Sequence, residues 1–224
     1  MEKKFELTEN YVVNELGTKL CQIKCTKTFK YAKEGELGGY IEKEENLSQE
    51  GDAWVSDNAR VFGNALVSGN ARVFGDARVS VNARVYGNAE VSGNAWVFGN
   101  ARVFDDARVS VNARVYGNAE VLGNAQVSGN ARVFGNARVF DDAEVSGNAE
   151  VLGNAQVSGI ARVYGNAWVF GDARVYGNAW VFDDAQVSGN ARVSGDACLK
   201  SDADHCGFDC FGSSNRHTRL YDRG

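Results

Sequence analysis

The dominant pattern in the sequence is a six-residue phrase, Gly-Asn-Ala-x-Val-Ser/Phe/Tyr, that repeats from Gly51 to Lys200 with no inserted or deleted residue. Alanine occupies every sixth position from Ala53 to Ala197. Valine follows two places later in each hexad, from Val55 to Val193. A repeat of fixed period indicates an array of identical structural units, so one elongated body is expected here.

Within each hexad, apolar and polar positions alternate and are followed by a glycine-containing pair. The alternation places Ala and Val on one face of a short strand and the other two side chains on the opposite face. Gly, Asn and Asp enter left-handed backbone conformations easily, so each Gly-Asn or Gly-Asp pair predicts a sharp corner. The hexads therefore predict a solenoid whose strands pair with the coils above and below. A meander of two-residue hairpins is the alternative, but it would give a thin, one-sided sheet.

The absence of proline agrees with a solenoid, because interior strands must donate every backbone N–H. The phrase Val-Ser-Gly-Asn-Ala-Arg resembles the hexapeptide repeat of left-handed parallel β-helix proteins. That resemblance implies a three-sided prism with three hexads per coil, and the twenty-five hexads of residues 51–200 would make about eight coils. The expected fold class is all-β: a left-handed parallel β-helix with a small N-terminal β cap.

The two ends of the chain differ from the repeat. We expect residues 1–50 to form the β cap and a degenerate first coil, residues 51–200 the solenoid, and residues 201–224 a short C-terminal cap or tail. Ile41 and Leu47 are placed in phase with the alanine column. The stretch that begins Leu37-Gly-Gly-Tyr-Ile and the tail pieces Lys-Ser-Asp-Ala-Asp and Gly-Ser-Ser-Asn-Arg resemble segments of uncharacterised bacterial and prophage hexapeptide-repeat proteins.

Sorting the outward positions by a period of three hexads gives one side that is the most aromatic. We regard it as a candidate surface for a protein partner or for self-association. The simpler interpretation is that stacked rings stabilise neighbouring coils, as cross-strand pairs do in any sheet. The residues of this side are Phe62, Trp96, Phe98, Tyr116, Phe134, Trp168 and Phe170.

Two segments are copied at an offset of thirty residues. Val79–Glu90 is identical to Val109–Glu120, and Ala119–Gly129 is identical to Ala149–Gly159. Thirty residues are five hexads, which is not a whole number of three-hexad coils. Each copy should therefore lie on a different side from its parent, which favours rod length over a face-specific ligand row as the selected property.

Known hexapeptide-repeat proteins include acyltransferases and metal-dependent carbonic anhydrases, and the resemblance covers only the coil pattern. The acyltransferases use a histidine base beside loops that interrupt the coils. The carbonic anhydrases need three histidine ligands for each metal ion. This chain has an uninterrupted repeat and only two histidines, His205 and His217, both in the tail. The residues favour a non-catalytic protein, and we assign no catalytic, cofactor-binding or metal-binding residue and no cofactor.

Two groups of potential metal ligands have plainer interpretations. His205, Cys206, Cys210 and His217 have no strong zinc-ligand spacing, so structural thiols are the simpler account. The pairs Asp105-Asp106, Asp141-Asp142 and Asp183-Asp184 could hold calcium, but a role in forming corners is the simpler one. Ice binding by a solenoid calls for flat threonine arrays, and no threonine occurs between Thr28 and Thr218.

Composition and net charge limit the expected cellular location of the protein and the classes of partner that it could bind. Net charge is −5 and there is no secretory signal or membrane-spanning apolar run, so we expect a cytoplasmic protein that binds neither nucleic acid nor membrane. Five cysteines, an odd number, suggest reduced thiols. The sequence predicts a rigid non-catalytic scaffold or protein-binding rod, with an unknown protein partner or with homo-oligomers formed side by side or end to end. The alternatives are a divergent acyltransferase acting as a trimer and a self-assembling fibre.

Overall fold

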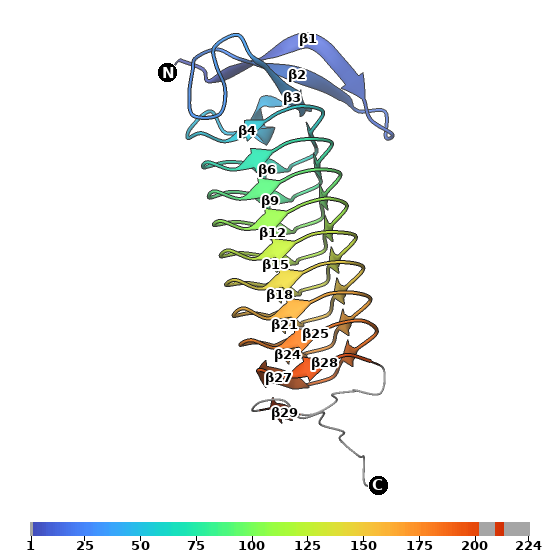
Figure 1. Ribbon diagram of the computed structural model, residues 1–224. Coiled ribbons are helices and arrows are strands. Elements are labelled where there is room, and N and C mark those ends of the chain that lie inside the picture. The colour runs from blue at the N-terminus through green and yellow to red at the C-terminus, as the bar shows by residue number, and fades with distance from the viewer. Residues whose placement is uncertain (1, 202–208, 213–224) are drawn as a thin grey trace.

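The protein is an all-β parallel solenoid in which the chain winds into a long, three-sided stack of coils (Figure 1). The computed structural model describes residues 2–201 and 209–212. Three sheets run the length of the rod, and consecutive strands of the repeat belong to three different sheets in turn. The fold class predicted from the hexads and from their resemblance to hexapeptide-repeat proteins, a three-sided β-solenoid with an N-terminal β cap, is confirmed.

The first sheet, here called the cap sheet, has eleven strands and includes the three N-terminal strands. Its strands, in order, are β1 (Phe5–Val13), β2 (Lys19–Cys25), β3 (Leu37–Ile41), β5 (Arg60–Val61), β8 (Arg78–Val79), β11 (Trp96–Val97), β14 (Arg114–Val115), β17 (Arg132–Val133), β20 (Glu150–Val151), β23 (Trp168–Val169) and β26 (Gln186–Val187).

The other two sheets have nine strands each. The β4 sheet contains β4 (Trp54–Val55), β7 (Arg72–Val73), β10 (Glu90–Val91), β13 (Arg108–Val109), β16 (Gln126–Val127), β19 (Glu144–Val145), β22 (Arg162–Val163), β25 (Trp180–Val181) and β28 (Cys198–Leu199). The β6 sheet contains β6 (Leu66–Val67), β9 (Arg84–Val85), β12 (Arg102–Val103), β15 (Glu120–Val121), β18 (Arg138–Val139), β21 (Gln156–Val157), β24 (Arg174–Val175), β27 (Arg192–Gly195) and β29 (Asp209–Gly212).

Alanine and valine fill the interior of the rod. Apart from Ala197, which is partly buried, the alanine and valine columns of the hexads are buried, almost all with no exposed surface. Neighbouring coils pair in register at a spacing of eighteen residues, so that Val97 lies beside Val79 and Val115. Burial of two small apolar side chains in every hexad is the main favourable term that holds the coils together.

Hydrogen bonds join the corners as well as the strands. In one hexad Arg114 N donates to Ala131 O (2.9 Å), Tyr116 N to Val133 O (3.0 Å) and Asn118 N to Gly135 O (2.7 Å). The glycine of each corner has a positive φ, and a Cβ at Gly99 would lie 3.0 Å from the backbone nitrogen of Gly117. Glycine is therefore required at most corners both for its conformation and for the close approach of the next coil.

The first coil is longer than the others, which corrects one prediction. Ile41 pairs with Val61 and Leu47 with Val67, so both belong to the valine column and not to the alanine column. These offsets are twenty residues instead of eighteen, and the two additional residues lie between Leu47 and Val55. The coil also contains the short 3-10 helix η1 (Glu44–Asn46). The six-residue phase cannot be extended backwards across that insertion.

The cap strands extend the cap sheet beyond the first coil and continue the core upward. Strand β2 pairs antiparallel with β1 and β3, and β3 pairs parallel with β5. The side chain of Gln49 accepts hydrogen bonds from the backbone N–H groups of Lys4 and Phe5, and it donates to the carbonyl of Phe5. In this way residues of the enlarged first coil cover part of the outer edge of β1.

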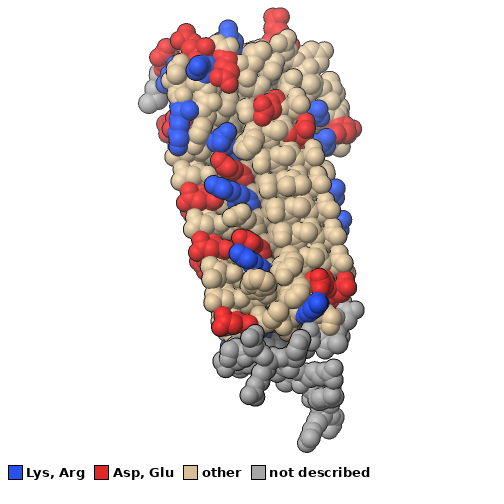
Figure 2. All heavy atoms as spheres, viewed as in Figure 1, with Lys and Arg blue, Asp and Glu red and all other residues tan. Residues whose placement is uncertain are grey.

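The thirty-residue copies lie on different sheets, as predicted. Arg84 and Val85 form β9 of the β6 sheet, whereas the identical pair Arg114 and Val115 forms β14 of the cap sheet. The face seen in Figure 2 shows the outward charges as a narrow column in which basic and acidic side chains follow one another along the rod, beside a broad uncharged strip. No helix in the described part of the chain is long and apolar enough to span a membrane.

Candidate functional site

The aromatic side chains predicted as an interaction surface lie on the cap sheet, where three of them form one stack. The rings of Phe98 and Tyr116 are 4.8 Å apart and 4° from parallel, and those of Tyr116 and Phe134 are 4.8 Å apart and 3° from parallel. All three residues are half-buried. Because the ring faces contact one another, only the ring edges reach the surface. Burial raises the pKa of the Tyr116 hydroxyl above its ordinary value.

Trp96 ends this stack on its N-terminal side. Its ring lies 4.7 Å from that of Phe98 at an angle of 41°, and its Nε1 donates a hydrogen bond to Ser80 Oγ (3.3 Å). Ser80 occupies the aromatic position of the coil above and is buried. Trp96 therefore fills the space that the small side chain of Ser80 leaves, so its exposed part belongs to a packed element.

The remaining members of the predicted surface are separate from the stack. Phe62 and Phe170 are half-buried and Trp168 is 45% exposed, and in the described part of the chain none of the three has a ring partner. The seven residues thus share one side of the rod, but the structure brings only four of them together. Stacking that stabilises adjacent coils explains those four, and Trp168 is the most accessible of the set.

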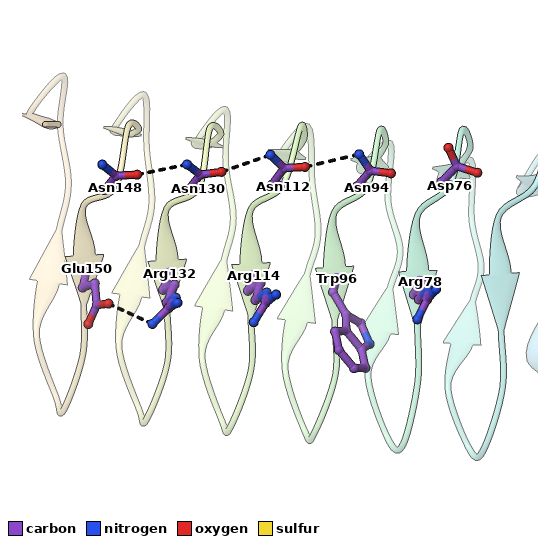
Figure 3. Close-up of a pocket in the computed structure, with 10 residues that line it drawn as sticks. All are labelled: Asp76, Arg78, Asn94, Trp96, Asn112, Arg114, Asn130, Arg132, Asn148 and Glu150. Atoms are coloured by element: carbon purple, nitrogen blue, oxygen red, sulfur yellow. Dashed lines mark hydrogen bonds and ion pairs between the residues drawn. The ribbon is translucent and has the colours of Figure 1, made fainter. Parts of the chain in front are cut away.

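An open polar groove runs along the same side of the rod and was not predicted from the sequence. Its volume is about 750 Å³, and it extends over five consecutive strands of the cap sheet, β8 to β20. One wall is a row of corner residues and the other is a row of outward strand residues, as Figure 3 shows. The polar groove is lined by Asp76, Arg78, Asn94, Trp96, Asn112, Arg114, Asn130, Arg132, Asn148 and Glu150.

The corner wall is a ladder of side-chain amides with a single direction. Asn94 Nδ2 donates to Asn112 Oδ1 (3.2 Å), and the same bond repeats from Asn112 to Asn130 and from Asn130 to Asn148 (3.0 Å each). The ladder continues through Asn166 to the carboxylate of Asp184. Every amide therefore points its nitrogen toward the C-terminal end of the rod, and an Asp, which can only accept, terminates the ladder.

A second and longer ladder of the same kind follows another corner. It starts where Lys43 Nζ donates to Asn64 Oδ1 (3.1 Å) and ends where Asn154 Nδ2 donates to Asp172 Oδ1 (2.8 Å). Aspartates that replace glycine at corners adopt positive φ, as Asp105 and Asp141 do, and each of these two accepts a hydrogen bond from the glycine N–H of the coil below. Corner formation thus accounts for the Asp pairs seen in the sequence.

The strand wall of the groove contains three arginines, two of which form ion pairs. Arg78 pairs with Glu15 of the cap (3.0 Å), and Arg132 pairs with Glu150 (3.2 Å). Arg114 has no ion pair within the described residues, although it lies in register with Arg132 on the adjacent strand. The pKa of Glu15 is lowered by a hydrogen bond from its own backbone and by the nearby Arg78. The middle of the groove therefore carries one uncompensated positive charge.

The described residues contain few groups suited to catalysis. Cys21, Cys25 and Cys198 are free thiols, and burial raises the pKa of Cys25, which keeps this thiol protonated and unreactive near neutral pH. Across residues 2–201 and 209–212, no group of three His, Cys, Asp or Glu side chains is arranged to hold a metal ion. The zinc ligands considered from the sequence, His205, Cys206 and His217, lie outside the described residues, as does the side chain of Cys210.

Comparison with known families agrees with the geometry of the coils. A family model described as the YdcK beta solenoid repeat matches residues 53–69, 65–81, 83–99, 113–129, 125–141 and 185–199. Each matched segment lies within the stacked coils. The chain is a hexapeptide-repeat β-solenoid protein. A search of curated proteins finds no match to this solenoid.

Proposed function

We propose that this β-solenoid is a rigid, non-catalytic rod that acts as a scaffold or as a surface for another protein. The observation that carries the proposal is the uniformity of the coils between Trp54 and Leu199. Each coil pairs with the next through the same backbone hydrogen bonds at strands and at corners, and within that range no loop leaves the prism. A body held at every corner resists bending, so its length fixes the distance between whatever binds its ends.

The cap sheet is the side that we assign to a protein partner. It contains the aromatic stack and Trp168, a residue that is 45% exposed and pairs with Glu150 at the C-terminal end of the polar groove. Exposed tryptophan is favoured in protein interfaces because it offers a large contact area with a polar edge. The cytoplasm is the proposed location, and the resemblance of the N-terminal segment to prophage proteins makes a phage or host protein the proposed partner.

Light scattering over a concentration series, together with small-angle X-ray scattering, tests this proposal. We expect a constant mass and a rod profile whose length follows the number of coils. A mass that rises with concentration would support the fibre alternative, in which the ends of the rods stack. A constant trimer that also binds acyl-coenzyme A saturably in calorimetry would support the acyltransferase alternative and overturn the scaffold.

A further inference from the structure

The polar groove offers side chains, and not backbone, to a ligand. Along its floor the backbone is already used between coils, because Asn112 N donates to Gly129 O (2.9 Å) and Arg114 N donates to Ala131 O (2.9 Å). An incoming β-strand would therefore find no free N–H or C=O groups to pair with. Each ladder amide, in contrast, has one Nδ2 hydrogen and one Oδ1 lone pair left after its bonds to neighbouring amides.

These spare donors and acceptors repeat once per coil. The polar groove spans five strands of the cap sheet, and the coil spacing of about 4.8 Å gives it a length of about 19 Å. A ligand that matched this row would be an extended polymer with a donor and an acceptor in every unit, and with a rise per unit close to one coil. A peptide strand rises about 3.3 Å per residue, so its residues would fall out of step with the coils.

The charges in the groove favour a sparsely acidic ligand. Arg114 and Arg132 lie directly opposite on adjacent strands, and only Arg132 has a carboxylate partner. Like charges in register are destabilising, and a bound carboxylate beside Arg114 would relieve this contact through a charge-assisted, two-point hydrogen bond. Asp76 and Glu150 at the two ends of the groove would repel a polyphosphate that carried a charge on every unit.

We propose that the polar groove binds an extended polysaccharide in which uronate and neutral sugars alternate, such as hyaluronate. Sugar hydroxyls both donate and accept, which matches the spare groups of Asn112 and Asn130. A uronate carboxylate pairs with Arg114. The Trp96 ring packs against Phe98 and lies below the guanidinium of Arg78, and the part of it that stays exposed supplies an apolar contact for a sugar. Because the rise of one sugar in an extended polysaccharide is similar to that of one coil, successive sugars meet equivalent groups on successive coils. This ligand goes beyond the scaffold role and does not depend on it.

Calorimetry with hyaluronate oligomers of two to six sugars, added to the full chain, tests the proposal. We expect one site per chain, with an affinity that rises with length up to about four or five sugars, the number that the groove can hold. The decisive variant is Arg114→Gln, which should weaken binding at least tenfold. The copied segment supplies its matched control, Arg84→Gln. Arg84 has the same neighbours in sequence, lies in register with Arg102 in the same way, and is not part of the groove.

The control variant should bind as the unmodified protein does, and both variants should keep its thermal midpoint. Equal losses in the two variants would mean general charge attraction and would overturn the proposal. Binding of oligoglutamate as tight as that of the hyaluronate oligomers would also overturn it, because the groove would then recognise acidic chains in general. No binding of any hyaluronate oligomer at millimolar concentration would overturn it as well, and would leave the scaffold role untouched.

Discussion

Asn94 turns the oxygen of its side-chain amide toward the carboxylate of Asp76 in the coil above, and no hydrogen bond joins the two (Figure 3). Asp76 already accepts from Asn58 Nδ2 (3.2 Å), and it has no hydrogen to pass on. Two acceptors therefore face each other. As a result this corner carries two separate ladders, one from Asn58 to Asp76 and one that starts at Asn94, where it could carry a single one.

We predict that Asp76→Asn joins these two ladders and stabilises the rod. The new amide would still accept from Asn58 and would donate to Asn94, which adds a hydrogen bond worth about 1 kcal/mol and removes the contact between acceptors. The denaturant midpoint should rise accordingly. The reverse change, Asn112→Asp in the ladder that starts at Asn94, keeps the acceptor but removes the donor to Asn130, and it should lower the midpoint. Equal midpoints for both variants would contradict the ladder as a stabilising element.

Two valines occupy corner positions where the other coils mostly have glycine. Val81 and Val111 each have a φ of 65°, a conformation that β-branched residues rarely adopt. Replacing either by glycine should stabilise the protein by about 1 kcal/mol, because the strain of the left-handed conformation exceeds the entropy cost of glycine. Thermal unfolding would measure this change.

The control for the corner valines is Gly99→Val, one coil below Val81 on the same corner. Its added Cβ would lie 3.0 Å from the backbone N and O of Gly117, so this variant should unfold at lower temperature than the unmodified protein. If Val81→Gly also lowers the midpoint, the strain assigned to the valine is wrong.

The copied segments allow one comparison of ring stacking. Tyr116 stacks between Phe98 and Phe134, whereas its copy Tyr86 stacks only on Phe104, at 4.9 Å. Tyr116→Ala should therefore destabilise the protein by about 1 kcal/mol more than Tyr86→Ala, the value of one additional aromatic pair. Urea unfolding of the two variants measures the difference. Equal losses would mean that the stack contributes nothing beyond the burial of each ring.

Lys4 is a buried cation in the cap. It is only 2% exposed, and its Nζ donates to Ala53 O (2.9 Å) and Gly51 O (3.2 Å). Burial lowers its pKa to about 8, so the folded protein releases this proton more readily than the unfolded chain does. The cost of burying the charge is full below pH 8 and disappears as pH rises toward the ordinary lysine value. Stability should therefore increase over that range, by about 3 kcal/mol.

The test is the pH dependence of the unfolding free energy in Lys4→Met, which should lack this increase. Burial raises the pKa of Cys25, and this thiol contributes in the opposite direction. Because the charge of Lys4 also acts on the pKa of Cys25, the two proteins are compared in a Cys25→Ala background. Lys3→Met removes an exposed lysine that pairs with Glu44, and it should keep the increase. An unchanged pH profile in Lys4→Met would assign the effect to another group.

Most of the fold could be predicted from the sequence because each hexad has the same order of buried, outward and corner residues. Alanine and valine at fixed positions, with glycine and asparagine at the corner, predict a solenoid, and the resemblance to hexapeptide-repeat proteins implies its three sides. The prediction was wrong for Ile41 and Leu47, because two additional residues in the first coil shift the phase and no hexad pattern marks them. The enlarged part of this coil contains Gln49, whose hydrogen bonds to the start of β1 join segments far apart in the sequence, and the repeat pattern does not predict such a contact.

The candidate site was harder to predict for a related reason. The position of Trp96 on the cap sheet follows from the period, but its hydrogen bond to Ser80 depends on which side chain occupies the coil above. The polar groove likewise requires that the row of corner Asn residues be considered together with the row of outward strand residues two positions further along the chain. A repeat pattern shows which residues stack, but it does not show the charge balance of Arg114, which depends on the partners of Arg78 and Arg132.

The thirty-residue copies, which moved from one sheet to another, also fix the direction in which the far end of the molecule faces. Adding or removing one hexad rotates everything after it by a third of a turn about the long axis, and only changes of three hexads preserve the original heading. The rod is therefore a rotary spacer as well as a linear one. A duplication such as that of Val79–Glu90 moves every later side chain to a different side of the rod, although none of those later residues has changed.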